Sequence, residues 1–268
     1  MVKISACLVI RNEEDLIGRA LDSVKGVVDE IIVVHSGKCT DTTLDIARKY
    51  THKVFIAPDR GAGCYNRPFA FAQATGDWII YIDADEYLSD ELRGKLRQLS
   101  LDETVDGYRF LHEVMVGFKP LKYAGHRLCM FRKSKGSVKG FIHEEVRVKG
   151  RVKSVNLVLH HRPDYDNYTM ETFNTKWMRW AKIQARDMVE DGRAKYPGFL
   201  YFPASLLLPV YVFSRDLFKG NGLNNGKAGI RIAYLQALYN FQVYWNIFKI
   251  KIGKPSDEIP VASPVAKN

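Results

Sequence analysis

The chain has 268 residues, of which 46% are hydrophobic and 12% aromatic, so it is long enough for one large domain or a domain with an appendage. A sequence this rich in apolar side chains can form a hydrophobic core, so the chain is not intrinsically disordered over its whole length. The formal net charge of +10 at pH 7 favours anionic partners, among them nucleic acid, acidic lipid and phosphorylated small molecules.

The cysteines and the amino terminus bear on the compartment. Four scattered cysteines form no Cys-x-x-Cys pair, which argues for a reducing environment. Cys7 and Cys129 lie in apolar, strand-like runs, where buried structural thiols are expected. The opening sequence MVKISACLVIRNEE has a short apolar run broken by Arg11, too short for a secretory signal peptide. We therefore expect a cytoplasmic protein.

The first hundred residues alternate between two patterns. Short β-branched runs predict strands at residues 4–10, 30–35, 53–57 and 77–82. Helical patterns occupy residues 13–24, 42–50 and 66–74, and Ser89 can cap a further helix. This alternation predicts an α/β fold with a mostly parallel, Rossmann-like sheet and helices on both faces. In such sheets ligands bind at the carboxyl ends of the strands.

The rest of the chain changes texture twice. Residues 107–162 are rich in β-type segments separated by glycine and lysine turns, which predicts added, partly antiparallel strands. Residues 164–191 predict a helix closed by Gly192. We therefore expect an α/β domain at residues 1–162, a helical extension at residues 163–252 and a disordered tail at residues 253–268.

The helical extension contains an unusually apolar segment. Residues 199–213 are almost wholly apolar, but two prolines interrupt them and a membrane span needs about 20 apolar residues. Basic residues and a segment rich in Tyr, Trp and Phe follow, which is typical of helices that lie at a membrane surface. The alternative is that these helices pack against the core, each other or a second subunit of a homo-oligomer.

The stretch WIIYIDADEY, residues 78–87, places three carboxylates directly after a buried strand. Such closely spaced acids repel one another unless a cation lies between them. In an extended strand end Asp83 and Asp85 would point to the same side, where their hard oxygen atoms suit Mg²⁺ or Mn²⁺. The spacing excludes an EF-hand, because Leu88 stands where that loop needs glycine. The alternative is a pair of solvated acids that open a helix.

Four motifs in order resemble glycosyltransferase family 2, above all its bacterial lipopolysaccharide-core and envelope-glycan enzymes. They are ACLVIRNEEDLIGRALDSV, EIIVVHSGKCTDTTLDIA, NRPFAFAQATGDWIIYIDADE and GFIHEEV. The resemblance implies a GT-A fold whose residues 1–162 bind a nucleotide-diphosphate sugar and transfer the sugar with inversion. It also implies a divalent metal held by the DxD acids Asp83 and Asp85, and a glycan or lipid-linked acceptor.

The resemblance assigns roles at the donor side. A metal bridging the acids to the diphosphate would act as a Lewis acid, and Arg11, Arg60 and Arg67 could contact phosphate. Arg11 and Glu13 match family positions that contact the nucleoside. The family usually has Asp in the second motif where this chain has His35, followed by Ser36. Because His35 cannot mimic a carboxylate, the identity of the nucleobase stays open, although we expect the base to lie near it.

An inverting transfer needs a base that removes the acceptor proton. Family members carry a His-Glu pair at the position of Glu144, which makes Glu144 the candidate. Glu145 would point the other way on a strand, and Glu86 is the competitor because it follows the metal acids. His160 or His161 could supply a further metal ligand, as in some members. A structural histidine is an equal alternative for either.

Two other functions compete with transfer. The chain could be an inactive nucleotide-sugar or carbohydrate-binding scaffold, with His35 as a mark of decay. It could also bind nucleic acid, but its aromatic residues gather in the apolar segment and are not interleaved with basic residues on strands. We therefore expect an enzyme that does not bind nucleic acid. We also expect it to lie peripherally on the inner face of the cytoplasmic membrane.

Overall fold

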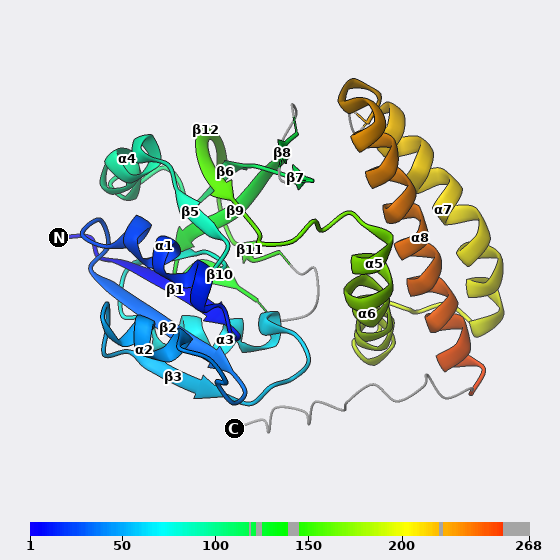
Figure 1. Ribbon diagram of the computed structural model, residues 1–268, viewed down its shortest axis with the longest axis horizontal. Coiled ribbons are helices and arrows are strands. Elements are labelled where there is room, and N and C mark those ends of the chain that lie inside the picture. Colours follow the sequence, from blue (N-terminus) through cyan, green and yellow to red (C-terminus); the bar gives the residue numbers. More distant parts are fainter. Residues whose placement is uncertain (118, 122–124, 139–144, 220–221, 254–268) are drawn as a thin grey trace. The chain divides into compact units, whose positions relative to one another are not determined.

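The computed structural model describes residues 1–117, 119–121, 125–138, 145–219 and 222–253, and Figure 1 shows the arrangement. The chain divides into two compact units. The first unit contains the described residues of the ranges 1–114 and 125–164. The second holds 115–121 and 165–253. The tail expected at residues 253–268 lies almost wholly outside the described part.

The first unit begins with the predicted βαβ alternation. Its strands are β1 (Ile4–Ile10), β2 (Glu30–Ser36), β3 (Val54–Ala57) and β4 (Trp78–Tyr81). Between them lie α1 (Glu14–Val24), α2 (Thr43–Arg48), the 3₁₀ turn η1 (Gly63–Asn66) and α3 (Arg67–Gln73). The pairs β3–β2, β2–β1 and β1–β4 are all parallel, as predicted.

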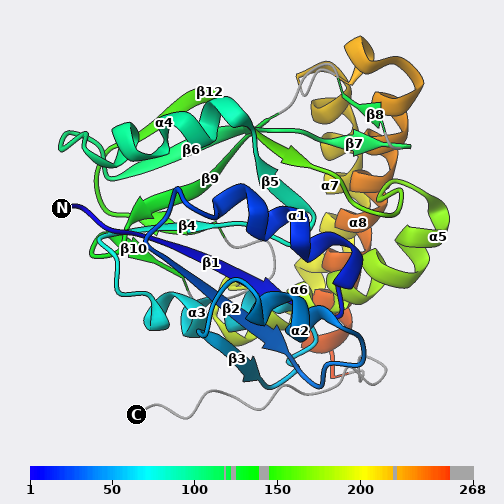
Figure 2. The same cartoon turned by 60° about the vertical axis from the view of Figure 1, so that its left-hand side comes forward.

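The later strands extend this sheet. They are β5 (Glu86–Leu88), β6 (Gly107–His112), β9 (Gly125–Arg132) and β12 (Val152–His161). The sheet order is β3-β2-β1-β4-β9-β6-β12-β5, in which β9 runs antiparallel to both β4 and β6. Two short strands, β10 (Gly136–Ser137) and β11 (Arg147–Val148), form a separate ribbon. The predicted α/β class and the partly antiparallel addition are confirmed, and Figure 2 shows the sheet from a second side.

The sheet core explains which sequence runs became strands. Apolar side chains of β1, β2 and β4 are buried on both faces of the sheet, as expected of parallel strands covered by helices. Cys7 and Cys129 lie in this core, where burial raises the pKa of both thiols, that of Cys129 to about 12. Helix α4 (Asp90–Ser100) begins at the predicted cap, since the Ser89 hydroxyl accepts a hydrogen bond from the Leu92 amide (3.2 Å).

The second unit is mainly helical. Besides the short strands β7 (Met115–Val116) and β8 (Lys119–Pro120), it contains α5 (Met170–Thr172), the π-helical turn η2 (Phe173–Trp177) and α6 (Met178–Glu190). The 3₁₀ turn η3 (Gly198–Leu200) leads into α7 (Tyr201–Phe218), and η4 (Leu223–Asn225) into α8 (Gly226–Lys251). The helices α6, α7 and α8 pack together around a second apolar core. No helix in the described part of the chain is both long and hydrophobic enough to cross a bilayer.

Candidate active site

The order of the parallel strands marks one edge of the sheet as the candidate site. From β1 the chain passes outward to β2 and β3, and then returns to place β4 on the other side of β1. Right-handed crossovers therefore put α1 and α2 on one face and α3 on the other. The carboxyl ends of β1 and β4 flank this switch point, where open α/β sheets bind ligands. Arg11 follows β1, and Asp83 and Asp85 follow β4.

The two acids lie in a tight turn between β4 and β5. The Glu86 amide donates to the Asp83 carbonyl (3.0 Å), and the Asp83 amide donates to the Glu86 carboxylate (2.8 Å). The expectation of an extended strand end was therefore wrong, because the chain reverses here to pair β5 with β12. The simple rule that residues i and i+2 share a side does not apply in a turn. The acids still follow the buried strand at the ligand-binding edge.

Asp83 is held between two arginines. Its carboxylate lies 3.2 Å from a guanidinium nitrogen of Arg67 and 3.2 Å from one of Arg127. Both guanidinium groups also lie over the Tyr81 ring, at 5.2 and 4.9 Å from its centroid. The Asp83 side chain is 41% exposed, whereas those of the two arginines are about one-fifth exposed. This arrangement sets two guanidinium groups, which are good hydrogen-bond donors to phosphate, beside an accessible carboxylate that offsets part of their charge.

Glu86 is the buried anchor of this cluster. It is 2% exposed, its carboxylate forms an ion pair with Arg127, and it lies 2.8 Å from His112 Nε2. Burial alone would raise the pKa of Glu86, but Arg127 and His112 outweigh it and hold the pKa well below its usual value. The residue predicted as the competing base is therefore a buried, ionised group with three partners.

The adjacent histidines of β12 serve different acids. His161 Nε2 lies 3.1 Å from the Asp85 carboxylate, whereas His160 Nδ1 lies 2.8 Å from that of Glu113. The His160 ring also stacks on Tyr87, with centroids 4.7 Å apart. The structure thus brings His161 to the DxD turn, while His160, the predicted metal ligand, belongs to a neighbouring ion cluster. Burial lowers the pKa of His161, but the hydrogen bond and charge of Asp85 outweigh it and raise the pKa overall.

His35 links the loops that follow β1 and β2, and we call His35 with its contacts to Asn12 and Gly37 the His35 clasp. His35 is fully buried at the end of β2, its Nε2 accepts the Asn12 amide (3.2 Å), and its Nδ1 lies 2.9 Å from the Gly37 carbonyl. A nitrogen that accepts and another that faces a carbonyl require the neutral ring with its proton on Nδ1. Asn12 has a left-handed φ of 49° and makes two further hydrogen bonds to Thr40. The clasp thereby joins the loops that follow β1 and β2.

The other predicted donor-side residues lie around this clasp. The Arg11 guanidinium is half exposed and lies 2.9 Å from the Asp59 carboxylate. The Glu13 amide donates to the Thr43 hydroxyl (2.7 Å). The Ser36 hydroxyl is buried and accepts from the Asn66 side chain (2.9 Å), one residue before Arg67. The loops after β1 and β2 and the start of α3 are therefore tied together at the ligand-binding edge.

The predicted base is not placed by the structure. Glu144 lies outside the described residues. Its neighbour Glu145 is described, and its carboxylate forms a two-fold ion pair with Arg109 of β6, with one contact at 2.8 Å.

Few side chains that could bind a metal ion lie near the DxD turn. The described residues contain no group of three or more His, Cys, Asp or Glu side chains that could hold a metal ion. Asp83 and Asp85 alone still suit Mn²⁺ or Mg²⁺, which use one or two carboxylates and take further ligands from phosphate and water. The Nε2 atom of His161 is engaged by Asp85, and its Nδ1 atom is buried without a hydrogen-bond partner among the described residues. The residues present therefore fit a metal that the donor would help to hold.

Several residues of this cluster carried no signal in the sequence. They are Arg127, His112, Glu113 and Arg162, which pairs with Glu113. Arg127 stands directly before the apolar run 128–131 of β9, opposite Phe110 of β6, so it reaches Glu86 only through antiparallel pairing.

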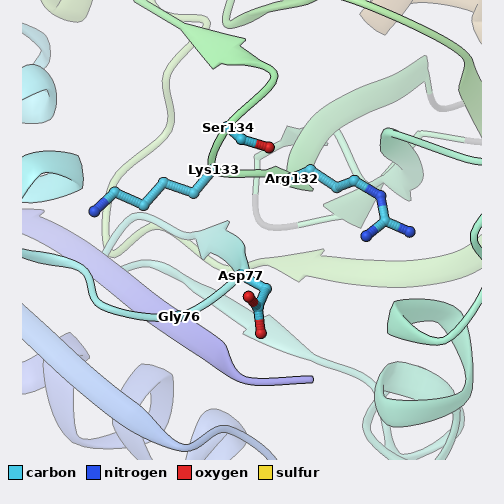
Figure 3. A pocket seen from close by; sticks show the side chains of 5 residues that line it. All are labelled: Gly76, Asp77, Arg132, Lys133 and Ser134. Atoms are coloured by element: carbon cyan, nitrogen blue, oxygen red, sulfur yellow. The ribbon is translucent and has the colours of Figure 1, made fainter. Parts of the chain in front are cut away.

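A hollow of roughly 450 Å³ lies elsewhere, at the amino end of β4. Figure 3 shows its lining by Gly76, Asp77, Arg132, Lys133 and Ser134. Lys133 bonds to the Ala74 carbonyl, and Arg132 donates to the Val105 carbonyl (3.1 Å), so both cations already have backbone partners. Since this hollow faces away from the carboxyl ends of the parallel strands, we assign it no part in the candidate site.

Comparison with known proteins identifies the family of the chain. Residues 5–149 match the family model "Glycosyl transferase family 2". An uncharacterised glycosyltransferase of Rickettsia felis is 30% identical over 243 residues, which cover 81% of this chain and 84% of the relative. The lipopolysaccharide core biosynthesis glycosyltransferase LpsC of Rhizobium meliloti is 28% identical over 262 residues, which cover 92% of each chain.

A solved structure was also similar. It is glucosyl-3-phosphoglycerate synthase from Mycobacterium tuberculosis in complex with Mn²⁺, uridine-diphosphate-glucose and phosphoglyceric acid. It is 17% identical with a TM-score of 0.47, covering 71% of this chain and 80% of that one. The family match spans more than half of the chain and includes both the clasp at His35 and the DxD turn. This chain belongs to glycosyltransferase family 2.

Proposed function

We propose that this glycosyltransferase moves a sugar, with inversion, from a nucleotide-diphosphate sugar to a lipid-linked or lipopolysaccharide-core acceptor, and that it needs Mn²⁺ or Mg²⁺. The observation that carries the proposal is the Asp83–Asp85 turn, which joins two carboxylates, two arginines and His161 at the carboxyl end of β4. The relationship to LpsC favours a lipopolysaccharide-core acceptor.

Charge at the leaving group is the chemical problem that the site addresses. As the sugar leaves, negative charge grows on the nucleoside diphosphate. A metal ion bound by Asp83 and Asp85 would supply Lewis-acid stabilisation to the diphosphate oxygens. Arg67 and Arg127 provide fixed guanidinium groups beside Asp83, and their stacking on Tyr81 limits their motion.

Glu86 acts by positioning in this proposal. Its carboxylate receives the Asp83 amide and pairs with Arg127, so it fixes both the turn and one phosphate-binding cation. A carboxylate that is 2% exposed and held ionised by Arg127 cannot approach an acceptor hydroxyl. We therefore keep Glu144 as the proposed general base. Glu144→Gln should reduce turnover by about a hundredfold to ten-thousandfold while donor affinity changes little.

The nucleobase should lie between the ends of β1 and β2. His35 would support that site without reading the base, because both of its ring nitrogens are already engaged with the backbone. Binding of uridine, guanosine, adenosine and thymidine diphosphates to the full chain would identify the base. If His35 does not read the base, a His35→Ala variant should prefer the four nucleoside diphosphates in the same order as the native chain. A reversed order would contradict this role.

The direct test of transfer measures nucleoside diphosphate released from a panel of nucleotide sugars with Mn²⁺ or with excess chelator. Asp83→Asn and Asp85→Asn should each lower kcat/KM by at least about a hundredfold. Asp45→Asn is a matched control, because this side chain is 74% exposed and pairs only with Arg48 among the described interactions. Donor binding without any release of diphosphate would instead support an inactive scaffold.

The acceptor and the location go together. We place the protein peripherally on the inner face of the cytoplasmic membrane, where a lipid-linked acceptor and a soluble donor meet. Labelled donor should pass its sugar to material extracted from membranes with detergent and not to delipidated cytosol. Transfer only to a water-soluble acceptor would contradict this placement while leaving the glycosyltransferase reaction intact.

A further inference from the structure

Helix α7 carries an apolar side that the described residues of its own unit leave exposed. Its buried residues Tyr201, Ser205 and Val212 lie on the side that packs along α8. The opposite side, which we call the α7 apolar face, consists of Leu206, Leu207, Val210, Tyr211 and Phe218. These residues are between 51% and 70% exposed.

The size of this face separates it from ordinary surface residues. Single exposed apolar side chains are common on soluble proteins, but five large ones on one side of one helix form a patch. The helix has its apolar core contacts already, including Phe202 with Phe248 at 5.6 Å between ring centroids and Tyr201 with Tyr244 at 6.2 Å. The exposed side is therefore surplus to the packing of α7 on α8.

The charge of the second unit indicates what covers the face. Residues 192–253 contain eight Lys and Arg and one acidic residue, Asp216. Three of the cations, Arg193, Arg215 and Arg231, pair with Asp191, Asp216 and Asp166, which leaves five lysines in excess. Two copies meeting through this face would bring the basic residues of both together, which opposes self-association. An anionic lipid surface offers phosphate groups to the cations and an apolar layer to the face.

We propose that the α7 apolar face docks on an anionic phospholipid surface, with α7 lying parallel to that surface. Both prolines of the helix, Pro203 and Pro209, suit a helix that lies at an interface and does not cross the bilayer. Docking rests on the membrane placement proposed above, but it uses no residue of the DxD turn, so vesicle binding can fail while sugar transfer persists.

Flotation of the full chain with vesicles tests the proposal. Vesicles with about 30% phosphatidylglycerol in phosphatidylcholine should carry the protein at low salt, and pure phosphatidylcholine vesicles should bind it at least about fivefold more weakly. Salt at about 0.5 M should weaken binding to the anionic vesicles, because exposed charges are then screened. A protein that stays in the soluble fraction with anionic vesicles at low salt overturns the proposal.

Variants locate the contact. Leu207→Glu should lower the partition coefficient between vesicles and water by at least about tenfold. It removes an apolar side chain that the lipid would bury and adds a negative charge that anionic lipid repels. Leu101→Glu is a matched control in the first unit, with 64% exposure against 70% for Leu207. Equal loss of binding in both variants would contradict the assignment to α7. So would a native dimer that Leu207→Glu converts to monomer while vesicle binding persists.

A measurement on the native chain guards against misfolding of the variants. Hydrogen exchange with and without anionic vesicles should show slower exchange in α7, because lipid contact protects its exposed side from opening. Protection confined to the first unit would contradict the proposal.

Discussion

The two units depart from the usual distribution of side chains in opposite directions. The first unit buries charge, with Glu86 at 2% exposure among Arg127, His112 and the Asp83 amide. The second exposes apolar surface, with Leu207 and Phe218 at 70% and 69%. Buried charge is stable only when every partner is present, whereas exposed apolar side chains contribute little to folding. Substitution of the buried charged residues should therefore lower the stability of the protein strongly, whereas substitution of the exposed apolar residues should change it little.

Removal of Arg127 should have the largest effect on stability. Arg127→Met leaves the buried Glu86 carboxylate without its cation, and we expect a loss of about 3–5 kcal/mol in the free energy of unfolding. Urea denaturation of the full chain measures it. The double variant Arg127→Met with Glu86→Gln should recover part of the loss, because no uncompensated charge is then buried. A double variant as unstable as the single one would contradict this account of Glu86.

Glu30 tests paired charge away from the candidate site. Burial opposes its ionisation, but hydrogen bonds from Lys53, Ser5 and Thr75 prevail and lower the pKa of Glu30 to about 2. Its contribution to stability is therefore complete above its ordinary pKa of about 4.5 and is lost as pH falls from there towards 2. Glu30→Gln should cost about 2 kcal/mol at pH 7 and flatten the pH dependence of stability in that range. Unchanged acid sensitivity in the variant would contradict this role.

The His35 clasp should show an intermediate effect. His35→Ala leaves the Asn12 amide without its acceptor and should cost about 1–3 kcal/mol. Donor KM should rise more than kcat falls, because the loops after β1 and β2 lose their link while the DxD turn stays in place. Thermal unfolding and steady-state kinetics measure the two effects. A fall in kcat alone, with KM unchanged, would mean that His35 acts on the chemical step.

The exposed side of α7 should show the smallest effect. Leu207→Ser and Val210→Ser should each change the free energy of unfolding by no more than about 0.5 kcal/mol, because both side chains are mostly exposed. Val212→Ser, on the packed side at 6% exposure, provides the contrast and should be clearly destabilising. Equal losses at Leu207 and Val212 would show that another part of the protein covers the α7 apolar face in solution.

The sequence predicted what depends on local pattern. The four parallel strands β1 to β4 and the Ser89 cap follow from periodicity and from capping preferences. The prediction that Asp83 and Asp85 lie in an extended strand end was wrong. They lie in a turn that leads to β5, and β5 forms only by antiparallel pairing with the distant β12. Arg127 and His112 join the site through antiparallel pairing of β9 with β4 and β6, which no local pattern specifies.

Residue identity alone could not assign His35 or choose between His160 and His161. The role of His35 depends on burial and on the left-handed Asn12 that it holds. Neighbouring residues on a strand point to opposite sides, so the register of β12 against β5 decides which histidine faces Asp85. That register is a tertiary property.

Binding of Mn²⁺ in the presence and absence of nucleoside diphosphate tests the central claim most directly. The described residues supply fewer than three clustered ligands, so a metal held by Asp83 and Asp85 has positions that the diphosphate of the donor can fill in place of water. Free Mn²⁺ measured by its paramagnetic resonance signal should show binding at least about tenfold tighter when the diphosphate is present. Asp85→Asn should abolish this coupling, and Asp45→Asn should leave it unchanged. Equal Mn²⁺ affinity with and without nucleotide, or coupling that survives in Asp85→Asn, would contradict the account.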